Sequence, residues 1–520
     1  MIFRSPYSEI TIPEVSLTQL VLRRAEELAD KPALIDGATN RVLTYGELSE
    51  GVRRVAAGLA ARGFQKGDVF AIFSPNHVEY AVAFHAVATL GGIVTTTNPL
   101  YTADELAHQL NDACVKYLLT VPQLIDKALE ASQGSKVQEV FVFGEAPGAA
   151  SFDSLLECEG LVPEVEINPR EDIVALPYSS GTTGVAKGVM LTHYNMVANL
   201  CQLEKIDRIS EQDTLIAVLP FFHIYGMNVI MNTGLFKGAA IVIMPRFELE
   251  QFLHVLQTYG VTRAHLVPPI MLALTKQPIV DGYDLSKLKL IMSGAAPLGE
   301  KLTAACCDRL KCVIKQGYGM TESSPVTHIS SEDPAETKYG SVGQCIPNTE
   351  CKIVDLETGA ELESGQEGEI CVRGPQVMKG YLNRPEATAQ TIDAEGWLHT
   401  GDIGYADEDG HFFIVDRAKE LIKYKGFQVA PAELEAVLLT HPMIADAAVI
   451  PSADEEAGEV PKAFVVLKGA ATKQEIKEFV AARVAPYKKI RQVEFIEQIP
   501  KSPSGKILRR VLVQRERERK

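Results

Sequence analysis

The sequence predicts an α/β protein whose large N-terminal domain consists of helix-covered sheets, and the alternation of two apolar patterns is the reason. Continuous apolar runs, such as residues 69–73 and 240–244, have the length and composition of buried strands. Between such runs lie helical patterns, such as residues 79–90, which place Ala, Val and Phe on one face. Strands and helices that alternate in this way favour parallel sheets covered by helices.

A change of pattern from about Thr349 onward indicates a small β-rich subdomain. Short β-like runs at 369–373 and 411–415 are separated by Gly and Asp turns. A boundary is expected after residue 416, so that residues 1–416 form the N-terminal domain and residues 417–520 form a small α+β C-terminal domain. Its expected elements are helices at 431–439 and 474–484, strands at 447–450 and 463–467, and a solvated helix end at 515–520.

The composition is that of an acidic globular protein. The chain has 520 residues, of which 46% are hydrophobic and 23% charged, and its formal net charge is −16. This balance argues against a nucleic-acid-binding surface, which needs clustered basic residues to displace the counterions of phosphates. A pocket for a polyanion would therefore have to concentrate its lysines and arginines locally.

The cysteines and the apolar segments predict a cytoplasmic protein without a membrane span. The nine cysteines are scattered and contain no CxxC pair, which favours reduced thiols over a zinc site or a disulfide framework. The N-terminus lacks the basic and apolar regions of a signal peptide. Residues 215–236 carry no charged side chain, but they include Pro220, Asn228 and Asn232, so we expect buried core there.

Residues 178–188 carry the richest local signal, a loop of glycines, hydroxyl residues and one lysine. Glycines let backbone N–H groups turn toward an anion, the hydroxyls add donors, and the lysine adds a mobile positive charge. It is not a Walker A loop, because Gly188 follows the lysine where that motif has Ser or Thr. The apolar run 173–176 precedes the loop, and Thr192, a good helix N-cap, follows it. The candidate phosphate-binding residues are Ser179, Ser180, Gly181, Thr182, Thr183 and Lys187.

At this loop the chain resembles the acyl-adenylate-forming superfamily, and four further segments resemble that superfamily's motifs in the same order. They are residues 316–322, 398–402, 416–423 and 500–506. Two more segments, 220–225 and 423–433, are most similar to 4-coumarate:CoA ligases and their bacterial relatives.

The resemblance implies an ATP-dependent carboxylic acid:CoA ligase that forms an acyl-adenylate before the thioester. Its co-substrates would be ATP and coenzyme A, with Mg²⁺ as cofactor and a 4-coumarate-like aromatic acid as substrate. A medium-chain fatty acyl-CoA synthetase and a luciferase-type monooxygenase are the alternatives. The resemblance also implies that the small C-terminal domain is mobile and closes over the site through a hinge near Lys419.

The same resemblance assigns residues to the nucleotide. Tyr318 would stack on adenine, with Ala295, Gln316 and Gly317 beside it, and Thr321 would donate to the α-phosphate. Asp402 can accept from both ribose hydroxyls, and Arg417 can donate to the same sugar. Glu322 would hold Mg²⁺, which prefers oxygen ligands.

Two sets of residues would perform the two half-reactions. Lys506 would neutralise the repulsion between carboxylate and phosphate during adenylation, and His223 would lie beside the reacting carboxylate. Lys423, Lys425, Gly426 and Gln428 would meet AMP or CoA after the C-terminal domain has moved, and Arg246 would contact a CoA phosphate. The acid pocket is assigned to Tyr225, Val229, Met292, Gly294, Gly317, Pro325 and Val326.

Overall fold

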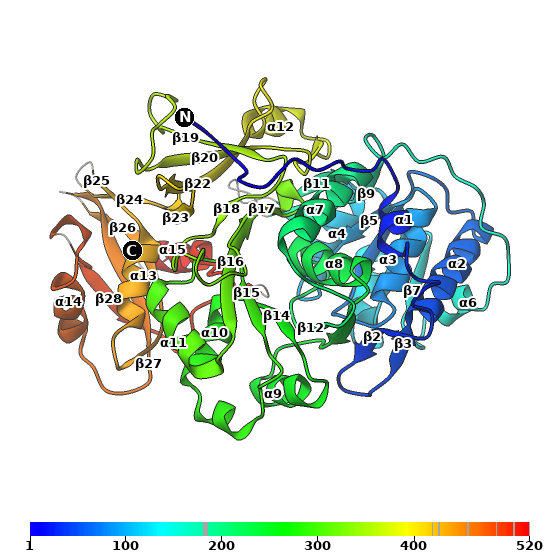
Figure 1. The fold of residues 1–520 in the computed structure, drawn as a ribbon, viewed down its shortest axis with the longest axis horizontal. Helices are drawn as coiled ribbons and strands as arrows, with labels where there is room; N and C mark the ends of the chain where they lie inside the picture. Colours follow the sequence, from blue (N-terminus) through cyan, green and yellow to red (C-terminus); the bar gives the residue numbers. More distant parts are fainter. Residues whose placement is uncertain are drawn as a thin grey trace.

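The computed structural model describes residues 1–179, 186–418, 420–424, 427–454, 457–484, 486–502 and 505–518. Within these residues the strands form four sheets, two large and two small (Figure 1). The structure therefore has the predicted α/β architecture, with a large helix-covered part and a smaller part built from the C-terminal segment.

The first large sheet carries the loop expected to bind phosphate. Its strand order is β10-β11-β9-β5-β4-β6-β7-β8, and β21 pairs with β11. Strands β4 to β8 run parallel to their neighbours, while β10, β11 and β21 pair antiparallel. The strands are β4 (Val69–Phe73), β5 (Ile93–Thr96), β6 (Val115–Thr120), β7 (Glu139–Val142), β8 (Ala150–Ser151), β9 (Ile173–Ala175), β10 (Tyr178–Ser179), β11 (Lys187–Thr192) and β21 (Gly380–Tyr381).

The second large sheet has the order β18-β17-β16-β15-β14-β12-β13-β2-β3. Its strands from β16 to β2 are parallel, and the edge strands are antiparallel. The strands are β2 (Pro32–Asp36), β3 (Val42–Thr44), β12 (Thr214–Ala217), β13 (Ala240–Ile243), β14 (Arg263–Leu266), β15 (Leu290–Ser293), β16 (Val313–Gly319), β17 (Val326–Ile329) and β18 (Gln344–Cys345).

Helices cover these sheets, and most of them pack in one large hydrophobic core that includes residues of both sheets, while α4 and α5 pack in a second, smaller one. Helix α3 (Tyr80–Thr89) was predicted to be apolar on one face, but residues 80–88 are all buried because it joins a core that includes residues of both sheets. The other helices here are α1 (Leu17–Val21), α2 (Tyr45–Ala61), α4 (Ala103–Asp112), η1 (Pro122–Leu124), α5 (Ile125–Ser132), α6 (Asp153–Leu156), α7 (His193–Ile206), α8 (Thr233–Phe236), α9 (Leu249–Thr258), α10 (Pro268–Lys276), η3 (Pro278–Gly282) and α11 (Glu300–Leu310).

The uncharged segment 215–236 lies in this core, as predicted. It contains β12, the π-helix η2 (Tyr225–Asn232) and α8, and every residue of η2 is buried. Among the described residues, no helix has the length and apolarity needed to cross a membrane.

The third sheet is the small β-rich subdomain that the change of pattern predicted. It is antiparallel, in the order β1-β19-β20-β22-β23. Its strands are β1 (Ile2–Arg4), β19 (Glu350–Val354), β20 (Gly368–Arg373), β22 (Leu398–Ala406) and β23 (Phe412–Arg417), and η4 (Thr321–Ser323) and α12 (Pro385–Thr391) are the nearby short helices.

The fourth sheet belongs to the C-terminal segment, in the order β25-β24-β27-β26 with β28 beside β27. It lies at one end of the molecule, next to β22 and β23 (Figure 1). Its elements are β24 (Ile422–Tyr424), β25 (Phe427–Val429), α13 (Pro431–Leu439), β26 (Ile444–Asp454), β27 (Gly458–Leu467), α14 (Lys473–Ala481), η5 (Pro486–Lys488), β28 (Gln492–Phe495) and α15 (Arg509–Arg517). The exact domain boundary at residue 416 stays a prediction.

The expectation that the chain ends in a solvated helix was wrong for one residue. Glu516 in α15 is 8% exposed, and its carboxylate binds the Lys462 ammonium and the Ser452 hydroxyl of the fourth sheet. An alternation of charges cannot reveal such a pair, because the partner lies 54 residues away in the sequence.

Candidate active site

A narrow cavity lies where η2 meets the ends of β15, β16 and β17. Its volume is about 50 Å³, enough for a few water molecules at about 10–15 Å³ each. Its lining includes six of the seven residues predicted for the acid pocket as well as His223, Ala295 and Tyr318. The lining residues are His223, Ile224, Tyr225, Met292, Gly294, Ala295, Gly317, Tyr318, Gly319, Met320, Pro325 and Val326.

The seventh residue of that prediction, Val229, does not line the cavity. Val229 is fully buried in η2, so its influence on the acid stays a prediction. The walls touch closely. A Cβ on Gly317 would lie 2.5 Å from the Met292 methyl, and one on Gly294 would lie 2.9 Å from the Tyr225 ring. The Tyr225 hydroxyl donates to the Met292 carbonyl at 3.2 Å, which fixes its ring.

His223 stands at the cavity in its neutral form. Its Nδ1 accepts a hydrogen bond from the Tyr225 N–H at 3.3 Å, so its proton is on Nε2. Burial, together with the nearby Lys506 charge, lowers the pKa of His223 to about 4. An uncharged imidazole beside the cavity can donate one hydrogen bond to a carboxylate.

The predicted ribose residues form a buried hydrogen-bonded group. Asp402 on β22 is 6% exposed, and its Oδ2 accepts from the Tyr318 hydroxyl at 2.7 Å. Its Oδ1 lies 3.2 Å from Nε of Arg417, which is paired with it across β22 and β23. Burial raises the pKa of Asp402 above its usual range, and the Arg417 charge acts against this rise. Each carboxylate oxygen has two acceptor positions, so both can still accept from a sugar hydroxyl.

The predicted metal ligand, Glu322, is buried beside strand β21. Glu322, in η4, is 3% exposed, and its Oε1 accepts from the Tyr381 hydroxyl at 2.9 Å. The Lys187 ammonium lies 4.6 Å from the centre of the Tyr381 ring. Burial and the Glu322 charge raise the pKa of Tyr381, so it stays a phenol and donates. A buried carboxylate with one oxygen fixed by a donor suits the hard ligand set of Mg²⁺.

Lys506 comes from the C-terminal segment, and its ammonium interacts electrostatically with Asp402 and Arg417 of the predicted ribose site. Burial lowers the pKa of Lys506 to about 8, helped by the Arg417 charge, while Glu420 and Asp402 act in the opposite direction. Its charge also acts on His223. The preceding Gly505 adopts a φ of +79°, and a Cβ there would lie 3.1 Å from Val267, so its loop rests on the large part of the protein.

The other predicted nucleotide residues lie close to these groups. The buried Gln316 amide oxygen accepts from the Leu298 N–H at 3.0 Å. Ala295 has a φ of +68° at the turn after β15, and Thr321 begins η4. Ser179 ends β10 and is paired with Lys187, the first residue of β11. Ser180, Gly181, Thr182 and Thr183 lie outside the described residues.

The residues predicted for CoA and the second half-reaction lie elsewhere. Arg246 is exposed after β13, and Lys423 is exposed on β24, where its N–H donates to Glu459 at 2.8 Å. Gln428 is paired with Lys423 across β24 and β25. Lys419, Lys425 and Gly426 lie outside the described residues.

Tyr381 is a site residue that sequence reasoning missed. It reaches Glu322 because β21 pairs with β11, next to the phosphate loop, and 59 residues separate the two side chains in the chain. No local pattern around Tyr381 indicates this contact.

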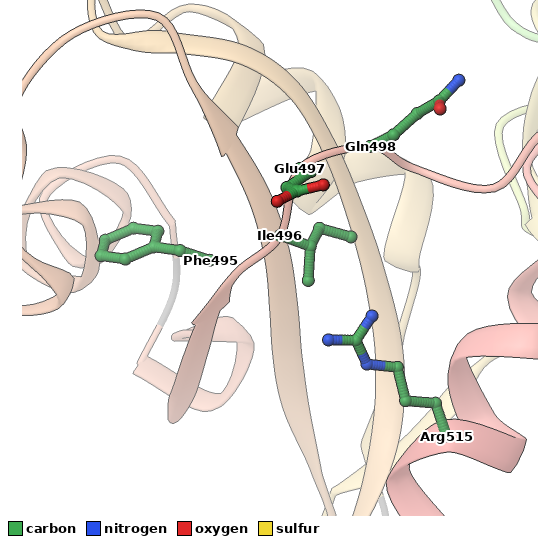
Figure 2. Close-up of a pocket in the computed structure, with 5 residues that line it drawn as sticks. All are labelled: Phe495, Ile496, Glu497, Gln498 and Arg515. Atoms are coloured by element: carbon green, nitrogen blue, oxygen red, sulfur yellow. The ribbon is translucent and has the colours of Figure 1, made fainter.

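A second pocket lies on the surface of the C-terminal segment, and none of the predicted site residues lines it. Figure 2 shows Arg515 of α15 reaching toward Ile496, while Phe495 points away from it. Arg515 pairs with Glu494 at 3.2 Å. The chemistry-bearing residues therefore gather at the narrow cavity and not at this pocket.

Comparisons with known proteins identify the family of the chain. The AMP-binding enzyme family matches residues 21–382, and the AMP-binding enzyme C-terminal domain matches residues 433–506. The chain belongs to this family, and it is an AMP-forming acid–thiol ligase.

The most similar relatives include a 4-coumarate–CoA ligase from Pinus taeda, 48% identical over 523 residues, which cover 98% of this chain and 97% of the relative. Among solved structures, an anthranilate CoA ligase in complex with anthranoyl-AMP has a TM-score of 0.90 at 25% identity, covering 98% of both chains. ATP-bound MatB from Rhodopseudomonas palustris has a TM-score of 0.87 at 30% identity, covering 97% of this chain and all of the other.

Proposed function

We propose that this chain joins 4-coumarate-like aromatic acids to coenzyme A, using ATP and Mg²⁺ and passing through an acyl-adenylate. Nearly full-length similarity to a 4-coumarate–CoA ligase supports the acid class. The observation that carries the mechanism is the position of Lys506. Its charge lowers the pKa of both His223 at the acid cavity and Asp402 at the ribose site.

The aromatic ring of the acid would lie in the cavity between the wall that contains Tyr225 and the wall that contains Gly317. Because the cavity holds only a few waters, its wall has to move for an aromatic ring. Met292 is the flexible part of that wall, since its thioether chain ends against Gly317. The carboxylate would then point toward His223, which can donate from Nε2.

In the first half-reaction a carboxylate oxygen attacks the α-phosphorus of ATP. The new bond joins that oxygen to phosphorus, and the bond from the α-phosphorus to the bridging oxygen breaks, so that pyrophosphate leaves. Two anions must approach each other, and the Lys506 ammonium neutralises part of this repulsion. Asp402 and Arg417 orient the ribose, and Tyr318 lies beside adenine.

Glu322 would hold Mg²⁺, with its second oxygen fixed by the Tyr381 hydroxyl. When bound, the ion would neutralise phosphate charge and favour departure of pyrophosphate. Lys187, whose ammonium lies 4.6 Å from the centre of the Tyr381 ring, would add positive charge.

In the second half-reaction the CoA thiol gives up its proton and attacks the acyl carbon. The carbon–sulfur bond forms, the bond from the acyl carbon to the phosphate oxygen breaks, and AMP leaves with that oxygen. Lys506 has no role there, and the C-terminal domain would turn about a hinge near Lys419. Lys423, Lys425, Gly426 and Gln428 would then face the nucleotide or CoA, with Arg246 near a CoA phosphate. The exposure of Lys423 supports a role in another arrangement of this domain.

The test measures AMP release and acyl-CoA formation with cinnamic, 4-coumaric, caffeic, benzoic and octanoic acids. We expect 4-coumaric acid to have the highest kcat/KM. A preference for octanoic acid would replace the proposal with a fatty acyl-CoA synthetase, and light emission with luciferin and oxygen would favour a luciferase-type monooxygenase. No AMP release with any acid would refute the proposal.

The variant Lys506→Ala tests the mechanism. It should abolish acid-dependent ATP–pyrophosphate exchange but still transfer the acyl group from a supplied acyl-adenylate to CoA. Lys501→Ala is the matched control, because Lys501 lies in the same segment but pairs with Asp446 at 2.6 Å. Equal loss of both half-reactions in Lys506→Ala would contradict the assignment.

A further inference from the structure

Asp416, the residue before the ribose-binding Arg417, makes a contact that none of the half-reactions above uses. Its Oδ2 accepts a hydrogen bond from the Ala432 N–H at 2.9 Å, and its Oδ1 accepts from the Arg417 N–H at 2.7 Å. The carboxylate is 6% exposed. Asp416 precedes the expected hinge near Lys419, and Ala432 follows it, so this hydrogen bond joins the two sides of the hinge.

The partner of Asp416 is the N-terminus of α13, which has no cap of its own. The helix begins at Pro431, which has no N–H, and its N-cap position is Ala430, which makes no side-chain cap bond. Ala432 therefore has the first free N–H of the helix. An aspartate there satisfies an otherwise unpaired donor and places negative charge at the positive end of the helix dipole. Asp416 thus acts as the missing N-cap, supplied from across the hinge.

Arg509 strengthens this arrangement from within the C-terminal segment. Its guanidinium binds the carboxylate of Glu435 at 2.7 Å and that of Glu420, and its Nε donates to the Val449 carbonyl at 3.2 Å. Burial raises the pKa of Asp416, and the Arg509 charge opposes that rise and so favours the ionised carboxylate. Arg509 begins α15 three residues after Lys506. Its guanidinium therefore connects the Asp416–Ala432 contact, which we call the latch, to the segment that carries Lys506.

The strand β23 brings the nucleotide site and this contact together. Consecutive residues of a strand point to opposite faces, and Asp416 and Arg417 follow this rule. Arg417 faces Asp402 at the ribose site, while Asp416 faces α13. The nucleotide-binding residue and the capping residue are therefore held by the same short piece of backbone.

We propose that Asp416 is a positioning residue for adenylation: by capping α13 across the hinge, it holds the C-terminal domain where Lys506 reaches the acid and ATP. This inference rests on the proposed function, and in particular on a turn of that domain between the half-reactions. Such a turn separates Asp416 from Ala432, so loss of the cap weakens the adenylating arrangement and leaves the thioester-forming one unchanged.

The experiment compares Asp416→Ala with Thr472→Ala. Thr472 caps α14 through its hydroxyl and the Glu475 N–H, so this control removes a helix cap from the same segment without crossing the hinge. We expect Asp416→Ala to slow acid-dependent ATP–pyrophosphate exchange roughly threefold to thirtyfold, the range that corresponds to loss of a helix N-cap. Thioester formation from supplied acyl-adenylate should not slow, and Thr472→Ala should leave both rates unchanged.

Two further measurements keep a structural defect apart from the proposed role. Asp416→Asn should restore most of the exchange activity, because asparagine is also a good N-cap. Trypsin should cleave between residues 417 and 425 several times faster in Asp416→Ala than in the wild type or Thr472→Ala, under conditions where all three are folded by circular dichroism.

The outcomes separate the two proposals. If wild-type protein shows neither half-reaction, the proposed function fails, while the cleavage rates still test the latch. Equal cleavage of Asp416→Ala and Thr472→Ala, or equal slowing of both half-reactions in Asp416→Ala, would overturn the role of Asp416.

Discussion

Replacing Tyr318 with phenylalanine isolates one hydroxyl in the ribose site. The ring that would lie on adenine remains, but the 2.7 Å hydrogen bond to Asp402 is lost. Because the Asp402 carboxylate is only 6% exposed, water cannot easily replace that donor. Arg417, at 3.2 Å from the other oxygen, would remain as its fixed partner.

The size of the effect follows from the kind of hydrogen bond. A hydrogen bond to a charged group contributes about 1.5–3 kcal/mol, and each 1.4 kcal/mol corresponds to about a tenfold change. We therefore expect Tyr318→Phe to lower kcat/KM for ATP by roughly tenfold to a hundredfold. The KM for the acid should change little, and the preference for ATP over 2′-deoxy-ATP should decrease, since Asp402 is no longer oriented toward the sugar.

The assay is initial-rate measurement of AMP release with ATP varied at saturating acid and CoA, repeated with 2′-deoxy-ATP. Tyr405→Phe is the control, because Tyr405 lies on the same strand as Asp402 with its ring stacked on Phe413 at 4.9 Å. A kcat/KM for ATP in Tyr318→Phe that matches this control would show that the hydroxyl does not orient Asp402.

Three other predictions concern the pH, the metal and the acid. Since the pKa of Lys506 is lowered to about 8 and only its charged form assists adenylation, the exchange rate should be highest below pH 8. One pH unit above that pKa the exchange rate should be about tenfold lower. Lys506→Arg should remove this decline because arginine stays charged. If the decline persists in the arginine variant, the titration of another group causes it. Tyr381→Phe should raise the Mg²⁺ concentration needed for half-maximal activity by about tenfold, since Glu322 loses its fixed donor, and an unchanged Mg²⁺ titration would argue against Glu322 as ligand. Gly317→Ala should raise the KM for 4-coumarate more than that for benzoate, because its Cβ would lie 2.5 Å from the Met292 methyl; equal changes for both acids would place the ring elsewhere.

Elements with strong local signals were predicted closely. The helix 431–439 matches α13 residue for residue, because Pro431 suits a first helical position and the apolar period sets its length. The strand predicted at 447–450 spans 444–454 as β26. Its ends, 444–446 and 451–454, gave no clear strand signal, and they pair with β27, which supplies their hydrogen-bond partners.

In the site, too, some features have local sequence signals and others depend on distant parts of the chain. The motifs predicted roles for Lys506, Glu322 and Asp402 in adenylation, and these roles stay predictions. The donors that orient them, Tyr318 toward Asp402 and Tyr381 toward Glu322, come from strand pairings that bring together distant parts of the chain. Tyr318 was predicted for its ring, and its hydroxyl contact emerged only in the structure.

By itself, the sequence determined the α/β class, the order of the elements and the set of charged groups, since each depends on residues near one another in the chain. Only the tertiary structure decided how those groups meet: which carboxylate oxygen has which donor, that His223 is neutral, and that Asp416 caps a helix beyond the expected hinge. The physical reason is that burial and pairing set the protonation state and orientation of a side chain, and both depend on neighbours that the fold brings from elsewhere in the chain.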